Sequence, residues 1–308
     1  MNPTTITLRN LAWDTAADIH LPPGFDPTKA YPTVLTAHPI GSCKEQTSGN
    51  VYAKALAEAG FIAVAFDASF QGDSGGEPRR MEDPALRVSD FRFVIDHLVT
   101  LPYVDAKRIG ALGICGGGGY TVAAAATDRR IKSVVSITGV NFGRLMREGF
   151  SAFNPVAALD AMAAQRTAEA RGTPRQIIDY LPASVAAAKA AGVTDIDLLE
   201  ATDYYRSPRA HHANGEVTGL FSFNSAAMAW DAFAHVELLL TQPLMVVVGD
   251  QVGGFGAYRD GCEVHGRAAS KHKELVVLPG VSHYALYDQP EAVGPALAKV
   301  IPFLQATM

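Results

Sequence analysis

The chain has 308 residues, of which 48% are hydrophobic and 19% are charged. This composition excludes an intrinsically disordered chain, because disorder goes with few apolar residues and a high net charge. The 26 Lys and Arg against 31 Asp and Glu give a net charge of −5, and no basic run suits a phosphate backbone, so we expect no nucleic acid partner.

Neither a membrane span nor an export signal is evident. No apolar run approaches the ~18 residues that a membrane-spanning helix needs, and the polar opening residues lack a basic stretch followed by an apolar one. We therefore expect a soluble, cytoplasmic protein with no membrane partner. The three cysteines, Cys43, Cys115 and Cys262, form an odd and sparse set, which favours free thiols over disulfides.

Strands and helices alternate through the first half of the chain. Residues 5–25 alternate in polarity and predict one or two strands at an antiparallel edge. Later runs, such as 62–66 and 134–137, are apolar at successive positions, as in strands covered on both faces. Because these runs alternate with helical stretches, they predict βαβ units and a mostly parallel sheet. The expected strands are 31–38, 61–69, 108–115 and 131–139, and the expected helices are 51–60, 88–101 and 116–126.

A helical segment interrupts this alternation. From residue 141 to 235, Ala-rich patterns such as 156–170 and 184–191 predict helices separated by polar turns. The alternation resumes with expected strands at 243–250 and 274–280 and expected helices at 259–269 and 292–305. We therefore expect an α/β core built from residues 1–140 and 236–308, with residues 141–235 inserted as a helical cap that could support a homodimer.

The segment around Cys115 carries the most informative motif. A strand runs into Cys115 and a small-residue helix follows at once, so that residues 113–117 read Gly-x-nucleophile-x-Gly. A sharp strand-to-helix turn needs glycine on both sides, because a Cβ there would collide with the turn. The helix N-terminus favours a thiolate and a lowered thiol pKa. Cys115 is therefore predicted to be a nucleophile at the carboxyl end of the sheet, in preference to part of a phosphate-binding loop.

Three further segments, considered together with this motif, point to a known family. They are residues 38–41 after the first central strand, residues 66–79 after the next, and Ser282 with His283 after the last. Together with the Cys115 turn, they make the chain resemble α/β-hydrolases, and specifically the dienelactone hydrolase-like branch, in which cysteine can replace serine. The resemblance covers essentially the whole chain outside the cap. It implies the α/β-hydrolase fold, a mostly parallel central sheet flanked by helices.

The resemblance also implies a catalytic triad. It makes His283, between the last strand and the final helix, the base that accepts the proton of Cys115. The acid of the family usually follows the preceding strand, but Val252 stands in its place, so the nearest carboxylate, Asp250, is predicted to orient His283. Two alternatives remain open: another carboxylate, Asp260 or Glu263, and a bare Cys–His pair, since a thiol needs less assistance than a hydroxyl.

Two backbone amides are expected to form an oxyanion hole. The resemblance assigns one to Gly116, which follows the nucleophile, and the other to the loop after the first central strand. Pro39 has no N–H group, so Ile40 is the expected second donor. His38 either supports this loop or lines the pocket.

Other polar residues near the pocket have less defined roles. Asp67 and Arg79 could bind a polar substrate group, although an ion pair that shapes their loop is the favoured reading. Cys43 could face the pocket, although an inert thiol is favoured. His211 and His212 are adjacent and lack a second ligand pair at zinc spacing, so we expect no metal and no cofactor.

The predicted function is hydrolysis of carboxylic esters, lactones or thioesters through an acyl-thioenzyme on Cys115. The expected partner is a small-molecule acyl substrate, roofed by aromatic residues of the cap. An acyltransferase with the same Cys–His pair is one alternative. A second alternative is a catalytically silent α/β-hydrolase that binds a small ligand beneath its cap. The absence of a carboxylate at the usual position of the triad acid favours this alternative.

Overall fold

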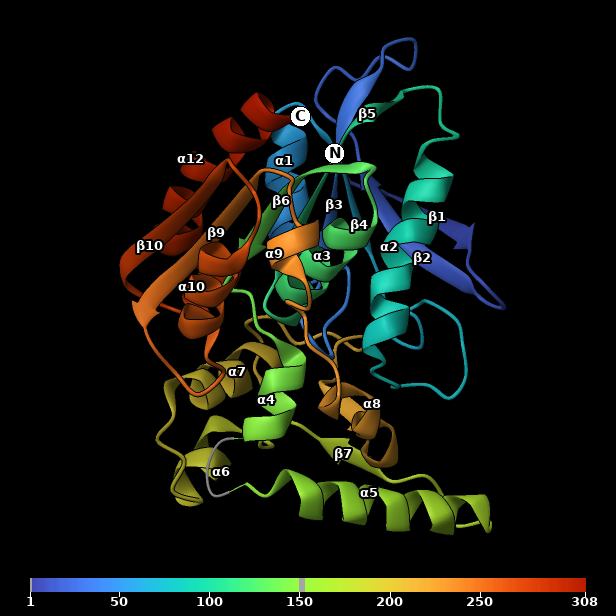
Figure 1. Ribbon diagram of the computed structural model, residues 1–308, viewed down its shortest axis with the longest axis vertical. Coiled ribbons are helices and arrows are strands. Elements are labelled where there is room, and N and C mark those ends of the chain that lie inside the picture. Colours follow the sequence, from blue (N-terminus) through green and yellow to red (C-terminus); the bar gives the residue numbers. More distant parts are fainter. Residues whose placement is uncertain (1, 150–152) are drawn as a thin grey trace.

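A computed structural model describes residues 2–149 and 153–308 and has an eight-stranded sheet at its centre (Figure 1). The strands of this sheet are β1 (Thr4–Arg9), β2 (Asp14–His20), β3 (Tyr31–Ala37), β4 (Ile62–Phe66), β5 (Val104–Ile114), β6 (Ile131–Ile137), β9 (Leu244–Gln251) and β10 (Lys273–Ser282). Their order is β1-β2-β4-β3-β5-β6-β9-β10. β2 is antiparallel to β1 and to β4, and the other pairs are parallel. The mostly parallel sheet with an antiparallel edge is therefore confirmed.

Helices cover both faces of this sheet, and several more lie in the segment between β6 and β9. They are η1 (Thr47–Ala53), α1 (Lys54–Glu58), α2 (Pro84–Leu98), α3 (Gly116–Thr127), α4 (Phe142–Glu148), α5 (Pro155–Ala170), α6 (Val185–Ala190), α7 (Ile196–Arg206), η2 (Phe221–Asn224), α8 (Ser225–Met228), α9 (Val236–Leu239), α10 (Ala257–Arg267), α11 (Ala285–Asp288) and α12 (Pro290–Thr307). In the described part of the chain, none of them is both long and apolar enough to cross a bilayer.

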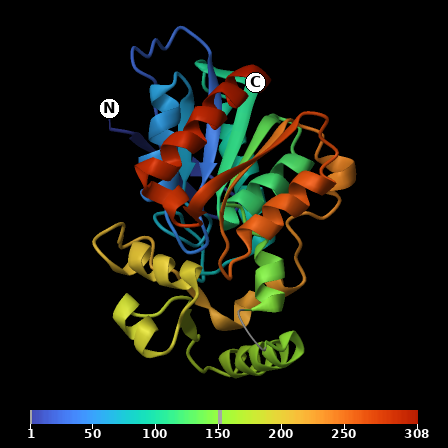
Figure 2. The ribbon, with the colours of Figure 1, turned by 90° about the vertical axis from the view of Figure 1, so that its left-hand side faces the viewer.

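The central strands are apolar at successive positions because both of their faces are covered. Val34 and Leu35 of β3 are both fully buried, but they belong to two separate core clusters, one on each face. Helices α2, α3 and α10 contribute to the cluster of Leu35, and α1 and α12 to that of Val34. Figure 2 shows the two sets of helices on opposite sides of the sheet. The α/β-hydrolase fold predicted from the sequence is therefore confirmed.

The strand register aligns the loops that were predicted to carry chemistry. Gly113 of β5 pairs with Ala37 of β3 on one side and with Ser136 of β6 on the other. The three strands therefore end side by side, and the loops that follow them meet at one edge of the sheet.

The segment between β6 and β9 lies at this same edge (Figures 1 and 2). It contains the predicted Ala-rich helices, which are α5 and α6. It also contains a small antiparallel sheet that the sequence did not predict, formed by β7 (Ile177–Asp179) and β8 (Thr218–Leu220). Strands of three residues are too short to show a periodicity, which explains why they were missed. The boundaries of a cap at residues 141 and 235 stay a prediction.

Candidate active site

Cys115 is the single residue between β5 and α3. β5 ends at Ile114, α3 begins at Gly116, and Cys115 between them has φ 54° and ψ −125°. This conformation costs free energy for a side chain other than glycine. Hydrogen bonds hold it in place: the Cys115 amide donates to the Ile137 carbonyl at 3.0 Å, and the Cys115 carbonyl accepts from Val140 at 2.9 Å. The strand–turn–helix predicted around Cys115 is therefore present.

The glycines that flank Cys115 are required by close backbone approach. A Cβ on Gly113 would lie 2.1 Å from the carbonyl oxygen of Gly117, and a Cβ on Gly117 would lie 2.4 Å from that of Ala37. No real Cβ tolerates such contacts. The Gly-x-Cys-x-Gly pattern therefore reflects the packing of α3 directly onto β3 and β5, as well as the turn itself.

Two amides and a hydroxyl converge on the sulfur of Cys115. The backbone amides of Gly116 and Ile40 and the hydroxyl of Tyr287 form hydrogen bonds with the sulfur that lower its pKa. Burial of the sulfur raises the pKa more strongly, and the result is a pKa of about 11. The sequence analysis expected the helix N-terminus to lower the thiol pKa. The net shift is upward instead, because the desolvation of the sulfur raises the pKa more than the hydrogen bonds lower it. Both amides that were expected to form the oxyanion hole lie next to the sulfur, and their role in catalysis stays a prediction.

Tyr287 links the thiol to the predicted base. Its hydroxyl, which bonds the sulfur of Cys115, lies 3.4 Å from Nε2 of His283. Nδ1 of His283 lies 2.8 Å from the hydroxyl oxygen of Thr138. Burial lowers the pKa of His283 to about 3, so its ring is neutral at neutral pH. A row of four residues therefore runs from Cys115 through Tyr287 and His283 to Thr138.

Asp250 does not hold the place that we predicted for it. Its exposed carboxylate accepts a hydrogen bond from the amide of Gly280 at 2.6 Å. Nδ1 of His283, which the acid should have bonded, contacts Thr138 instead. Asp250 therefore holds the irregular stretch of β10 between Leu278 and Ser282, and the prediction that it orients His283 is wrong.

The two alternative carboxylates are also occupied elsewhere. Asp260 is fully buried and pairs with Arg144 at 2.6 Å, and Glu263 pairs with Arg267 at 2.7 Å. Neither forms a hydrogen bond with His283 within the described ranges. A Cys–His pair without a carboxylate, the remaining alternative, agrees with this geometry.

Thr138 is a site residue that the sequence reading missed. It directly follows β6 and has a positive φ of 43°, and its amide donates to the carbonyl of Val247 at 2.7 Å. Its place at the end of the strand next to β5 was a usable signal, because neighbouring parallel strands end at the same edge. A hydroxyl can accept the Nδ1 proton but brings no negative charge, so it fixes the orientation of the ring without stabilising an imidazolium as a carboxylate would.

His38 supports the loop of Ile40. Its Nδ1 donates to the Pro39 carbonyl at 2.7 Å, and its Nε2 accepts from the amide of Ala68 at 3.0 Å. Burial and the nearby Arg87 guanidinium hold the pKa of His38 well below its usual range. Because the C=O and N–H of a trans peptide point in opposite directions, the bond to Pro39 fixes the direction of the Ile40 amide. Of the two roles considered for His38, support of the loop fits the structure.

Neither Asp67 nor Cys43 reaches the predicted pocket. Asp67 is fully buried and pairs with Lys44 at 3.0 Å, and burial raises its pKa to about 6. The sulfur of Cys43 lies 3.4 Å from Nδ1 of His212. His38, Asp67 and Cys43 are all absent from the residues that line the cavity at Cys115. They support the loops behind the site, and the prediction that they line the pocket is wrong. All three cysteines are free, as expected.

Cys43 is nevertheless part of a cluster that the sequence reading missed. The ligand atoms of Cys43, Glu45 and His212 lie within 4.8 Å of one another. Residue 212 is far away in sequence, so no spacing could reveal the group. Burial and the nearby Glu45 carboxylate raise the pKa of the Cys43 thiol, and Lys44 donates to Glu45 at 2.5 Å. A protonated thiol and a competing ammonium group both disfavour a metal ion at this place.

Arg79 shapes its loop, but not through the ion pair that was favoured. Its guanidinium donates to the carbonyl of Gly72 at 2.5 Å and to that of Ser74. Asp67, by contrast, does form the expected ion pair, with Lys44.

The thiol of Cys115 opens on an apolar cavity of about 180 Å³. It is lined mainly by aliphatic and aromatic side chains: Pro39, Ile40, Cys115, Val140, Phe142, Leu145, Met146, Gly149, Phe153, Tyr180, Leu181, Tyr205, Val217, Phe255, Tyr284 and Tyr287. Several of these, including Phe142, Tyr180 and Tyr205, come from the segment between β6 and β9. The prediction that aromatic residues of this segment cover an apolar pocket is confirmed.

A buried carboxylate, Asp197 of α7, stands close to this site. One of its oxygens accepts from the amide of Phe255 at 2.9 Å, and the other has no hydrogen-bond partner in the part of the chain that the structure describes. Burial raises the pKa of Asp197 to about 7, and its charge in turn raises the pKa of Cys115. The sequence reading missed Asp197 because it approaches the site from a distant helix.

Comparison with known proteins identifies the family. Residues 14–176, just over half of the chain, match the family model of the X-Pro dipeptidyl-peptidases, the S15 family. The chain belongs to the S15 family. Proteins of this family and the structural relatives below support its place among the α/β-hydrolases.

Several relatives of this S15-family chain match it over nearly its whole length. YcjY, an uncharacterized protein of Escherichia coli K12, is 39% identical over 95% of this chain and 94% of its own. The crystal structure of PA2218, a hypothetical protein of Pseudomonas aeruginosa, has a TM-score of 0.89 and 27% identity over 99% of this chain and 94% of that chain. The α/β hydrolase GrgF of a Penicillium species shares the fold, with a TM-score of 0.74 and 17% identity over 100% and 99% of the two chains.

Shorter matches include enzymes with named activities. A thiohydrolase of Eupenicillium brefeldianum is 31% identical over 34% of this chain and 34% of its own. An acyltransferase of Aspergillus calidoustus, DrtE, is 27% identical over 45% of this chain and 44% of its own. The chain is thus an enzyme of the α/β-hydrolase type whose relatives include hydrolases and an acyltransferase.

Proposed function

We propose that the protein hydrolyses carboxylic esters, lactones or thioesters through an acyl-thioenzyme on Cys115, in the manner of the dienelactone hydrolase-like branch. One observation carries the proposal: the sulfur of Cys115 lines an apolar cavity while the amides of Ile40 and Gly116 both point at it. Amides so placed can hold the oxygen of a carbonyl whose carbon the sulfur attacks.

The attack forms a bond between the sulfur and the carbonyl carbon and places a negative charge on the carbonyl oxygen. The amides of Ile40 and Gly116 bind this oxyanion. Removal of one such donor typically costs about 3 kcal/mol of transition-state stabilisation, so the position of the Ile40 loop matters as much as the thiol.

The thiol proton leaves through Tyr287. The proton passes from sulfur to the Tyr287 oxygen while the hydroxyl proton of Tyr287 passes to Nε2 of His283, because a hydroxyl donates and accepts at once. His283 becomes an imidazolium whose Nδ1–H donates to Thr138. The imidazolium of His283 then gives its proton to the leaving alcohol or thiol as the bond of that group to the acyl carbon breaks. Water attacks the thioester and gives a proton to His283. The acid is released as the carbon–sulfur bond breaks, and the proton on His283 returns through Tyr287 to the departing sulfur, which restores the thiol.

The cavity favours a short acyl group. Its volume of about 180 Å³ is below the ~300 Å³ at which pockets for drug-sized ligands begin. Its lining is almost entirely apolar, so an uncharged hydrocarbon acyl chain is the substrate portion that it fits. We therefore expect p-nitrophenyl butyrate to be cleaved much faster than p-nitrophenyl palmitate.

Acyl transfer is the second candidate, and the partner of His283 favours it. Thr138 offers no negative charge to stabilise the imidazolium that forms when water is activated, so hydrolysis of the thioester should be slow. A long-lived acyl-thioenzyme can pass its acyl group to another acceptor that enters the cavity.

The test follows the acyl group. After brief exposure to p-nitrophenyl butyrate, peptide mass spectrometry should find butyrylation on Cys115, and a Cys115→Ala variant should lose turnover whereas a Cys43→Ala variant should keep it. Added n-propanol then separates the two candidates, because butyrate marks hydrolysis and propyl butyrate marks transfer. Parental turnover in Cys115→Ala would refute both.

The silent alternative makes a different prediction for the ester. If the protein only binds a ligand, p-nitrophenyl butyrate should leave no butyryl group on Cys115, and Cys115→Ala should not change the rate at which p-nitrophenol is released. A saturable butyrylation of Cys115 excludes this alternative.

A further inference from the structure

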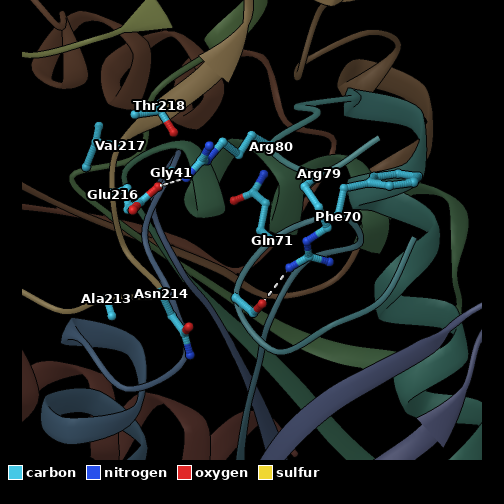
Figure 3. Close-up of a pocket in the computed structure, with 11 residues that line it drawn as sticks. Gly41, Phe70, Gln71, Arg79, Arg80, Ala213, Asn214, Glu216, Val217 and Thr218 are labelled. Atoms are coloured by element: carbon cyan, nitrogen blue, oxygen red, sulfur yellow. Dashed lines mark hydrogen bonds and ion pairs between the residues drawn. The ribbon is translucent and has the colours of Figure 1, made fainter. Parts of the chain in front are cut away.

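A second cavity lies on the other side of Val217 from the thiol. It has a volume of about 310 Å³ and is lined by Gly41, Phe70, Gln71, Gly72, Arg79, Arg80, Ala213, Asn214, Glu216, Val217 and Thr218. Val217 also lines the cavity at Cys115, but Cys115 is absent from the second cavity. Figure 3 shows that polar side chains surround this second cavity, which we name the Arg79 pocket.

Strained backbone is concentrated around the Arg79 pocket. Six residues other than glycine have a positive φ in the ranges that the structure describes, and three of them line the pocket: Phe70 (70°), Arg80 (65°) and Val217 (52°). For a β-branched residue such as Val217, this conformation is a genuine outlier. Two others, Cys115 and Thr138, belong to the candidate active site.

Hydrogen bonds hold these strained residues in place. The amide of Arg80 donates to the Phe70 carbonyl at 2.8 Å, and the amide of Val217 donates to the Gly41 carbonyl at 3.0 Å. Strain that a fold maintains with dedicated bonds is typical of ligand-binding and catalytic sites.

Gln71 supplies an unsatisfied acceptor. Its side chain is only 9% exposed, its Nε2 donates to the carboxylate of Glu82, and its Oε1 has no partner in the described part of the chain. Figure 3 shows the Gln71 carboxamide between Arg79 and Glu216, with its oxygen turned toward Gly41 and Glu216. A buried acceptor without a donor costs about 1–3 kcal/mol, and a ligand that donates a hydrogen bond would recover this cost.

Arg79 supplies an uncompensated positive charge. Its guanidinium donates to two backbone carbonyls, which leaves other N–H donors unused, and no carboxylate pairs with it among the described residues. The neighbouring Arg80 is different, because it pairs with Glu216 across the pocket. A carboxylate of a ligand could satisfy Arg79 in the two-pronged geometry that guanidinium groups favour.

From these contacts we infer that the Arg79 pocket is a second small-molecule site, which binds a carboxylate compound that also carries a hydroxyl or amino group. The carboxylate lies against Arg79, and the hydroxyl or amino group donates to Oε1 of Gln71. A molecule with only one of the two groups satisfies only half of the site.

The experiment compares three four-carbon molecules by calorimetry at pH 7. The probes are 3-hydroxybutyrate, which has both groups, butyrate, which has only the carboxylate, and butane-1,3-diol, which has only hydroxyls. A Cys115→Ala protein is used so that no turnover can contribute, and the result is therefore independent of the proposed function. We expect 3-hydroxybutyrate to bind about tenfold more tightly than either control. Butane-1,3-diol lacks the bond to the charged Arg79, which is worth about 1.5–3 kcal/mol, and butyrate leaves Oε1 of Gln71 unsatisfied, which costs about 1–3 kcal/mol.

Two variants locate the binding. Arg79→Gln should lower the affinity for 3-hydroxybutyrate at least about tenfold. Arg79 also holds its loop, so a second variant that leaves Arg79 in place is needed. Ala213 is exposed and lines the pocket, and in Ala213→Trp the indole should fill the pocket without removing a hydrogen bond of the fold. Equal affinities for 3-hydroxybutyrate and butyrate, or affinity that survives Ala213→Trp, would overturn the inference.

Discussion

Replacement of Tyr287 by phenylalanine tests the row of residues from Cys115 to His283. The change removes one oxygen atom, which bonds the sulfur of Cys115 and lies 3.4 Å from Nε2 of His283, and leaves the ring in place. A hydrogen bond to a charged group is worth about 1.5–3 kcal/mol, and one pKa unit corresponds to about 1.4 kcal/mol. The pKa of Cys115 should therefore rise above its value of about 11 by roughly one to two units.

The assay is the rate at which iodoacetamide alkylates Cys115 between pH 7 and pH 10. Only the thiolate reacts, so the parental rate should rise about tenfold per pH unit through this window, which lies below the pKa of about 11. In Tyr287→Phe the whole profile should lie roughly 10–100-fold lower. Turnover of p-nitrophenyl butyrate should fall about 100-fold or more, because the proton path to His283 is lost.

The control variant is Tyr180→Phe. Tyr180 lines the same cavity, but its hydroxyl donates to Oδ1 of Asn224 at 2.8 Å and lies outside the row from Cys115 to Thr138. It should retain the parental alkylation profile. Faster alkylation in Tyr287→Phe would refute the reasoning, since it would mean that the hydroxyl separates the thiol from the base instead of connecting them.

Three further substitutions give distinct outcomes. Gly117→Ala should destabilise the protein by about 1–3 kcal/mol or more in urea unfolding, because its Cβ would meet the backbone of β3 at 2.4 Å; an unchanged midpoint would contradict this packing. Asp197→Asn should accelerate alkylation of Cys115 several-fold at pH 8–9. The Asp197 carboxylate, with a pKa of about 7, is charged at this pH and raises the pKa of the Cys115 thiol. An unchanged alkylation rate would show that the charge of Asp197 does not affect the sulfur. Lys44→Met should cost about 3–5 kcal/mol, since it leaves the buried Asp67 carboxylate unpaired, and the double variant with Asp67→Leu should recover part of that loss.

The parts of the site that the sequence predicted are the local ones. Cys115 and its glycines were found because one strand, one turn and one helix fix their geometry. Ile40 followed from a simple exclusion, since Pro39 has no N–H group. His283 was assigned through the resemblance to α/β-hydrolases, which puts the base after the last strand. In each case a few neighbouring residues determine the conformation.

The parts that failed depend on packing between distant segments. Asp250 was chosen for its position after a strand, but the direction of the His283 ring decides which group meets Nδ1, and Thr138 meets it. Asp197 and Tyr287 approach the sulfur from α7 and α11, two helices that the sequence patterns did not predict. The expected lowering of the thiol pKa failed for the same reason, because the depth of burial depends on how the segment between β6 and β9 covers the turn.

The contact between α3 and β3 limits which parts of the active site can change. No space for a Cβ is left between Gly117 and the carbonyl of Ala37 or between Gly116 and the side chain of Ile40, so α3 packs directly on the segment that carries the Ile40 amide. A larger residue at either glycine would shift the sulfur relative to this amide. A change of substrate must therefore arise from the covering helices and loops, which can be remodelled while the reacting atoms keep their mutual distances.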